Sequence, residues 1–146
     1  MAFLNSLNIS GSGLTANRLR MDIVSQNVAN ASTTRTEAGG PYRRQMVVFQ
    51  PAEGGSFASL LEKNIAHASA ENKGVKVTAI VEDQTPFNVV YDPEHPDADA
   101  DGYVAMPNVD MVKETIDMMA ATRAYDANLT VLNAVKSMAA KALEIK

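Results

Sequence analysis

The stretch VDMVKETIDMMAATRAYDANLTVLNAVKSMAAKALEIK, residues 109–146, decides how this chain folds. It contains neither glycine nor proline, the two residues that cost a helix most. Apolar residues recur in it at a spacing near 3.5 residues, which is typical of a helix that packs along one side. At 1.5 Å per residue this helix spans roughly 57 Å. A compact domain of this size has a radius of gyration of only about 13–15 Å, so we expect the helix to extend past any core that the chain builds alone.

The apolar residues of this segment fall on more than one line along the helix. Val112, Ile116 and Met119 form one stripe. Further apolar residues continue at the 3.5-residue spacing or widen that face, namely Met118, Ala121, Tyr125, Leu129, Val131, Leu132, Val135, Met138, Ala139, Ala142, Leu143 and Ile145. Asn108 follows a proline and is the expected N-cap, with Asp110 favourable in the first turn.

A second helical period lies at the N-terminus. Apolar residues recur there every seven positions, at Leu7, Leu14, Met21 and Val28. Two glycines, at positions 11 and 13, each cost about 1 kcal/mol in a helix relative to alanine, so the helix is expected over about 12–30. The sequence NASTTRTEAGGP (30–41) then gathers turn formers and ends it.

The middle of the chain is predicted to form a small β-rich unit of three or four strands. Strands are expected in YRRQMVVFQ (42–50), in the alternating GVKVTAIVED (74–83) and in FNVVYDP (87–93). Residues 51–72 fit either a helical turn or a flexible loop. The expected fold class is α+β, with long N- and C-terminal helices packing as a coiled-coil-like pair. Assembly segments are expected at 1–34 and 108–146, flanking the β-rich unit and acidic linker at 35–107.

Two arrangements of the helices are compatible with these patterns. They could form an antiparallel hairpin buried inside one domain. They could instead pack between molecules, which is favoured by their terminal positions and their narrow, alanine-rich stripes. On the second interpretation, the helices of an isolated chain are barely stable. The entropy cost of ordering them, about 1–2 kcal/mol per residue, nearly equals the free energy gained by burying their apolar stripes. The terminal segments would then fold fully only on assembly.

Composition excludes several classes of protein. The chain has no cysteine, which excludes disulfides, thiol catalysis and Cys-ligated metals. Its net charge of −4 argues against nucleic-acid binding. The charge is uneven: residues 1–50 carry five Arg and two acids, whereas residues 51–107 carry three Lys and ten acids. No apolar run is long enough to cross a membrane, and no ordinary signal peptide is expected at the N-terminus.

The acidic stretch DPEHPDADADGYV (92–104) is the most plausible place for a metal. Asp97, Asp99, Asp101 and Gly102 match the first half of an EF-hand calcium loop. The twelfth position, which requires a bidentate Glu, is occupied by an asparagine, and prolines exclude the entering helix. We therefore expect no metal and no cofactor, and interpret the stretch as a solvated connector to the C-terminal helix. No catalytic motif is present, so the chain is not expected to be an enzyme.

Several motifs resemble those of the flagellar axial proteins. SGLTANRLRMDIVSQNVANASTTRT (12–36; shared core SQNVANAST) and PYRRQMVVF (41–49) are similar to the N-terminal signature of that family. The region from YDPEHPDADADGYVAMPNV to ATRAYDANLTVLNAVKSMAAKAL, residues 91–143, is similar to the C-terminal signature of its proximal rod members, the FlgC type. The resemblance spans nearly the whole chain and is weakest over 51–72.

The resemblance implies a structural subunit of the bacterial flagellar basal-body rod. Such a subunit would polymerise through its terminal helices into a tube that transmits torque and encloses the export channel. Its expected partners are other rod proteins, copies of itself and the flagellar type III export apparatus, with the surrounding basal-body rings as further candidates. It would be located in the periplasm without a cleaved signal. The alternative is a free-standing module that binds calcium or a peptide through residues 92–102.

The stripes predict which residues form the assembly interface. Polar residues near the end of the first helix could set the register between subunits, or could be exposed residues that cap the helix. Arg123 could pair with an acid on a neighbour, or could extend its apolar stem along the helix surface with its charge in water. The full expected set is Leu7, Leu14, Met21, Gln26, Asn27, Val28, Asn30, Met118, Arg123, Tyr125, Leu129, Leu132, Val135, Met138 and Leu143.

Overall fold

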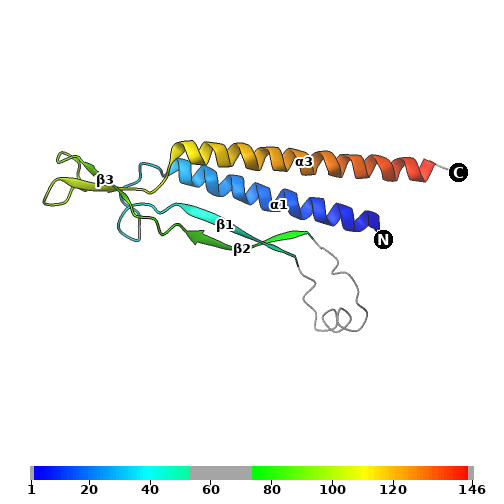
Figure 1. The fold of residues 1–146 in the computed structure, drawn as a ribbon, viewed down its shortest axis with the longest axis horizontal. Coiled ribbons are helices and arrows are strands. Elements are labelled where there is room, and N and C mark those ends of the chain that lie inside the picture. The colour runs from blue at the N-terminus through cyan, green and yellow to red at the C-terminus, as the bar shows by residue number, and fades with distance from the viewer. Residues whose placement is uncertain (1, 53–73, 145–146) are drawn as a thin grey trace, which may run out of the picture.

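The computed structural model of the protein describes residues 2–52 and 74–144. Its largest elements are two long helices, α1 (Ala2–Ala29) and α3 (Met111–Glu144). They run side by side, with both chain ends at the same end of the molecule (Figure 1). The α+β class with its pair of long terminal helices is confirmed. Most of the ambiguous segment 51–72 lies outside the described residues.

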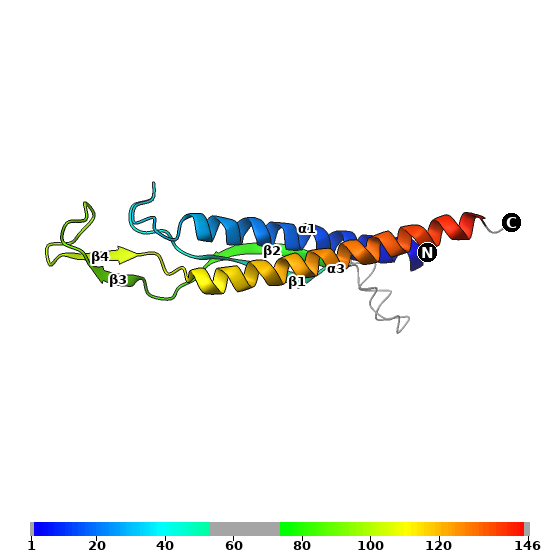
Figure 2. The same ribbon diagram turned by 90° about the horizontal axis from the view of Figure 1, so that it is seen from above.

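The two helices are antiparallel and pair within one chain. Contacts between them follow a single order, in which residue numbers fall along α3 as they rise along α1. These contacts are Gly13 with Asn128, Arg20 with Asp117, and Asn27 with Glu114. Of the two arrangements open at the level of sequence, the structure therefore has the internal hairpin. Because α3 is longer, it continues past the start of α1 (Figure 2).

The first helix begins at Ala2, earlier than the expected start near residue 12. Gly13 explains part of this difference. A Cβ atom on Gly13 would lie 2.9 Å from the side-chain oxygen of Asn128 on α3. The missing side chain lets the two helices approach closely, and the packing offsets the helix cost of glycine.

The cap of α3 also differs from the expectation. Asp110, not Asn108, caps the helix, because its Oδ1 accepts the backbone N–H groups of Val112 (2.9 Å) and Lys113 (3.3 Å). Asn108 instead donates its amide to the carbonyl oxygens of Asp83 and Thr85. It therefore joins the start of α3 to the end of a strand.

The strands form two separate two-stranded sheets instead of one β-rich unit. Strand β1 (Gln45–Pro51) pairs antiparallel with β2 (Val75–Glu82), and β3 (Asn88–Tyr91) pairs antiparallel with β4 (Tyr103–Met106). The first pair lies along α1, and the second projects beyond the start of α3 (Figures 1 and 2).

The β1–β2 pair is attached to α1 by close contacts. Ser12 Oγ accepts the backbone N–H of Val75 at 3.0 Å. Gly74, just before β2, has φ of +98°, and a Cβ there would meet the side chain of Ser12 and the Cα of Ile9. Both the backbone angle and the close approach require glycine at this position.

Few apolar side chains are buried among the described residues. They are Ala16, Ile23, Val24, Val104, Val109, Ala121 and Val135. Large apolar side chains are more often exposed, so the chain leaves much apolar surface without a partner. Neither described helix combines the length and apolarity needed to span a bilayer.

Candidate assembly interface

A buried polar cluster fixes the relative positions of α1, α3 and β1. At its centre is Asn27, whose side chain is inaccessible to solvent and uses its full hydrogen-bonding capacity. Its Nδ2 donates to the Gln45 carbonyl oxygen and to Glu114 Oε2, each at 2.9 Å. Its Oδ1 accepts from the Tyr42 hydroxyl (3.0 Å) and the Gln45 backbone N–H (2.9 Å). One side chain thus sets the register of three elements.

Glu114 and Arg44 form the ionic half of the same cluster. Glu114 on α3 is completely buried and accepts a 2.6 Å hydrogen bond from Arg44 Nε. Arg44 also forms ion pairs with Asp117 (Nη2 to Oδ2, 3.1 Å) and with Asp83 (Nη1 to Oδ2, 3.7 Å). Asp117 forms a second ion pair with Arg20 on α1, whose Nη2 lies 3.0 Å from Asp117 Oδ1. A buried charge is tolerated only when it is paired and hydrogen-bonded, and this arrangement meets both conditions.

The cluster keeps its groups in the protonation states that these bonds need. Burial, followed by the charges of Glu114 and Glu82, raises the pKa of the Tyr42 hydroxyl, which stays a donor to Asn27. Burial alone would lower the pKa of Arg44, but its hydrogen bond and charge interactions with carboxylates raise the pKa overall. The Thr85 backbone N–H that donates to Asp83 lowers the pKa of that carboxyl.

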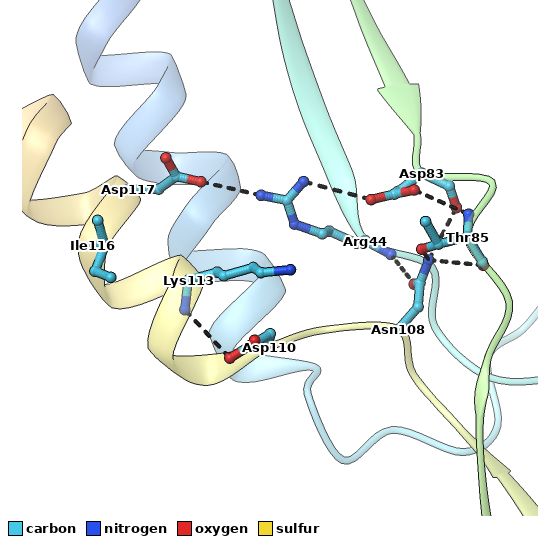
Figure 3. A pocket seen from close by; sticks show the side chains of 8 residues that line it. All are labelled: Arg44, Asp83, Thr85, Asn108, Asp110, Lys113, Ile116 and Asp117. Atoms are coloured by element: carbon cyan, nitrogen blue, oxygen red, sulfur yellow. Dashed lines mark hydrogen bonds and ion pairs between the residues drawn. The ribbon is translucent and has the colours of Figure 1, made fainter.

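A pocket of about 280 Å³ opens beside this cluster (Figure 3). Charged and polar side chains line most of it, and Arg44 points across it between Asp117 and Asp83. Its cations and carboxylates already satisfy one another in large part. We therefore attribute the pocket to the junction of the helices and strands and assign no ligand to it.

The residues predicted for assembly on α1 lie along one edge of the helix pair. The four heptad residues Leu7, Leu14, Met21 and Val28 are all half-buried. Met21 contacts α3, where the Thr122 hydroxyl lies 3.6 Å from its sulfur. Met21 therefore lies at the edge of the α1–α3 seam, and part of each of the four side chains stays exposed.

The three polar residues near the end of α1 have different roles. Asn27 sets register inside the chain, as described above. Gln26 is exposed. Asn30 forms local bonds at the helix end, donating to the Gln26 carbonyl oxygen (2.9 Å) and accepting from the Thr33 hydroxyl (3.2 Å).

The residues predicted on α3 fall into two groups. Val135 is buried in the seam, and Met118, Tyr125 and Leu132 are half-buried. The remaining four are exposed, namely Arg123, Leu129, Met138 and Leu143. The predicted set therefore combines residues of the internal seam with residues that are free to meet a neighbour.

An exposed surface on α3 combines the predicted Arg123 with three apolar residues that were not part of the predicted set. We call it the outer face of α3, and it consists of Val112, Ile116, Met119 and Arg123, all exposed. Each lies two positions from the buried Glu114 or Ala121, and two residues turn a helix by about 200°, so the face points away from α1. The spacing of its three apolar residues was visible in the sequence, but nothing there showed which stripe would face α1.

The acidic stretch 92–102 has a different place from the one expected. It does not connect the β-rich unit to the C-terminal helix but closes the β3–β4 hairpin, where Asp92 N–H donates to the Gly102 carbonyl oxygen at 2.9 Å. Asp97 is tied to the segment after α1 through the Thr34 hydroxyl at 2.9 Å and Arg35 at 3.7 Å. Across residues 2–52 and 74–144, no group of three His, Asp or Glu side chains is placed to hold a metal ion.

Comparison with known proteins gives matches at both ends of the chain and along its whole length. The family described as "Flagella basal body rod protein" matches residues 7–35, and the family described as "Flagellar basal body rod FlgEFG protein C-terminal" matches residues 100–145. These ranges include most of α1 and all of α3.

Curated relatives are similar from end to end. A flagellar basal-body rod protein FlgC of Bacillus subtilis is 51% identical over 149 residues, with 99% of this chain and 99% of the relative covered. Those of Borreliella burgdorferi and Escherichia coli O157:H7 are 44% and 45% identical, each with 99% of this chain and 98% of the relative covered. None of these matches supports a calcium- or peptide-binding module.

Proposed function

Because this chain belongs to the FlgC family of flagellar basal-body rod proteins, we propose that it builds the proximal rod by packing exposed helix surfaces against other rod proteins and copies of itself. The chain is a structural subunit of the rod in the flagellar basal body, and the family is one of structural proteins, not enzymes.

The observation that supports this mode of assembly is the outer face of α3. Three large apolar side chains stand exposed on successive turns, at Val112, Ile116 and Met119. Removing apolar surface from water contributes about 25 cal/mol per Å² to stability. On this face the chain obtains that stabilisation only when a neighbouring subunit covers the three side chains. A long helix with one face packed inside the chain and another face bare suits a subunit that packs side by side with others.

The proposal assigns different roles to three parts of the chain. Residues 1–34 and 108–146 are the assembly segments, and 35–107 braces them. A second contact surface runs along the helix pair. It consists of the four half-buried heptad residues of α1 together with Leu129, Met138 and Leu143. The assembled helices form a tube that transmits torque and encloses the export channel. The subunit reaches the periplasm through the flagellar export apparatus, and the surrounding rings are candidate neighbours.

The role as a rod subunit predicts a clear phenotype. A strain that lacks this chain should assemble no functional rod and should not swim, because the tube would be interrupted at this subunit. Restoring the chain should restore swimming, and basal bodies isolated from that strain should contain it. Normal swimming without the chain, or its absence from isolated basal bodies, would contradict the proposal.

A further inference from the structure

One face of the β3–β4 hairpin has no partner among the residues that the structure describes. Neighbouring residues on paired strands share a face, and on this face Val89 and Tyr91 are each 65% exposed, with Tyr103 beside them. The two tyrosine rings meet edge to face, 5.3 Å apart. On the opposite face Val104 is buried. We call Val89, Tyr91 and Tyr103 the bare face of the hairpin.

The tip next to the bare face is acidic. Asp92, Glu94, Asp99 and Asp101 are exposed, and only Asp97 is paired with residues after α1. The hairpin therefore presents an aromatic and aliphatic surface that ends in four exposed carboxylates, of which Asp92 also accepts the Glu94 backbone N–H at 3.3 Å. Tyrosine is enriched in protein interfaces, and a sheet of two strands is marginally stable unless something packs on it.

The outer face of α3 also combines an apolar row with a charged end, and the charge is positive, opposite to that of the hairpin tip. Its apolar residues Val112, Ile116 and Met119 are followed one turn later by the exposed Arg123. Within residues 112–123 the two acids are committed elsewhere, since Glu114 is buried and Asp117 pairs with Arg20 and Arg44. The next acid, Asp126, is exposed about one turn after Arg123.

The bare face is short enough to lie on the outer face of α3. Val89 and Tyr91 are about 7 Å apart along β3, whereas the α3 stretch from Val112 to Met119 spans about 10 Å, with Arg123 about 6 Å further along. A hairpin whose bare face lies on the three apolar residues would place its acidic tip next to Arg123.

These two surfaces cannot meet within one chain. The hairpin projects beyond the start of α3, whereas the outer face extends along α3 in the opposite direction from that start (Figures 1 and 2). The short connection between them is fixed, since Pro107 and Val109 are buried and Asn108 accepts the Arg44 backbone N–H at 2.9 Å. The hairpin therefore has no freedom to fold back.

We propose that the bare face of the β3–β4 hairpin docks on the outer face of α3 in a second copy of this chain, with Asp99 and Asp101 next to that copy's Arg123. This inference rests on the proposed function and specifies the contact. The contact joins two different surfaces, so repeating it generates a ring or an open helical array of subunits and not a two-fold dimer.

Cross-linking in assembled rods tests this contact directly, since the chain has no cysteine of its own. In a strain with only the Asp101→Cys, Arg123→Cys double variant, isolated basal bodies are treated with a short bismaleimide. We expect dimers and higher multimers of this chain. The matched control is Asp101→Cys with Arg18→Cys, which places the second cysteine on an exposed position of α1. Multimers should exceed the control about tenfold or more, since contact raises the effective concentration of the two thiols.

A strain that swims but gives no more multimers than the control would overturn the inference and leave the role as a rod subunit intact. Cross-links from position 101 to a different rod protein would also overturn it, because the occupant would not be a second copy.

A charge exchange provides a second test that needs no cysteine. Asp99→Lys with Asp101→Lys, or Arg123→Glu alone, should each reduce the swimming zone about twofold or more, and combining them should restore most of it, as expected for charges in direct contact. A combination that swims no better than the weaker of the two would refute the pairing.

Discussion

Replacing Ile116 and Met119 together by Asp should abolish swimming while leaving the isolated chain as stable as before. In the chain these side chains are 60% and 52% exposed, so charges there remain in water. Exposed substitutions usually change the free energy of unfolding by no more than about 0.5 kcal/mol. In the assembled rod the same positions are covered, and an unpaired buried carboxylate costs several kcal/mol. Swimming in soft agar and thermal unfolding of the purified chain measure the two effects separately.

The matched control adds the same two charges to α1. Asn8 and Thr15 are polar and exposed, and they are seven residues apart, so Asn8→Asp with Thr15→Asp places both charges on one exposed side of that helix. This variant should swim. If the Ile116 and Met119 variant swims equally well, the outer face of α3 is not an assembly surface.

Arg44→Leu should reduce the stability of the chain by about 3–5 kcal/mol, because it leaves a buried carboxylate without its cation. Glu114 would keep only its bond to Asn27, in a position closed to water. The free energy of unfolding from urea titration, compared with that of the unchanged chain, gives the loss. A loss below about 1 kcal/mol, the range of exposed ion pairs, would show that the cluster is not a structural centre.

Glu114→Gln provides the complementary arm of a double-mutant cycle. Alone, it leaves Arg44 with two carboxylates, Asp117 and Asp83, so it should cost less than Arg44→Leu. In the Arg44→Leu background it should recover part of the lost stability, because the buried group is then neutral. Strictly additive effects would contradict the direct pairing of Arg44 with Glu114.

The elements of the fold were predictable because their signals are local. The absence of glycine and proline after Val109 and the heptad at Leu7–Val28 specified two helices, and alternation specified β2. The strand Tyr103–Met106 was missed, since it is short and follows a run of turn-forming residues. Its pairing with β3 depends on a hairpin loop of eleven residues, closed at Gly102 with φ of +80°, which no short turn motif indicates.

The polar cluster was not predictable, because its members are far apart in the sequence. Asn27, Arg44 and Glu114 belong to three different elements, and each alone resembles an exposed polar residue. Glu114 did occupy a position seven residues before the buried Ala121, on the side of α3 that faces α1. A charged residue on that line signals a buried ionic partner, but the sequence does not identify it as Arg44.

The N-cap of α3 was predicted wrongly for the same reason, because distant contacts decide it. Asn108 and Asp110 are both good N-cap residues, and local sequence does not separate them. The choice is made by contacts from elsewhere, since Asn108 is already bonded to Arg44, Asp83 and Thr85.

If assembly covers the outer face of α3, a cysteine in place of Val112 should become inaccessible to reagents when the chain enters the rod. The rate of reaction with a small maleimide is measured on the purified chain and on isolated rods, with rods dissolved in denaturant as the reference for full reaction. We expect fast labelling of the isolated chain and labelling of intact rods at least about a hundredfold slower, as for a site that opens only against about 3 kcal/mol. Equal rates in the two states would contradict the account.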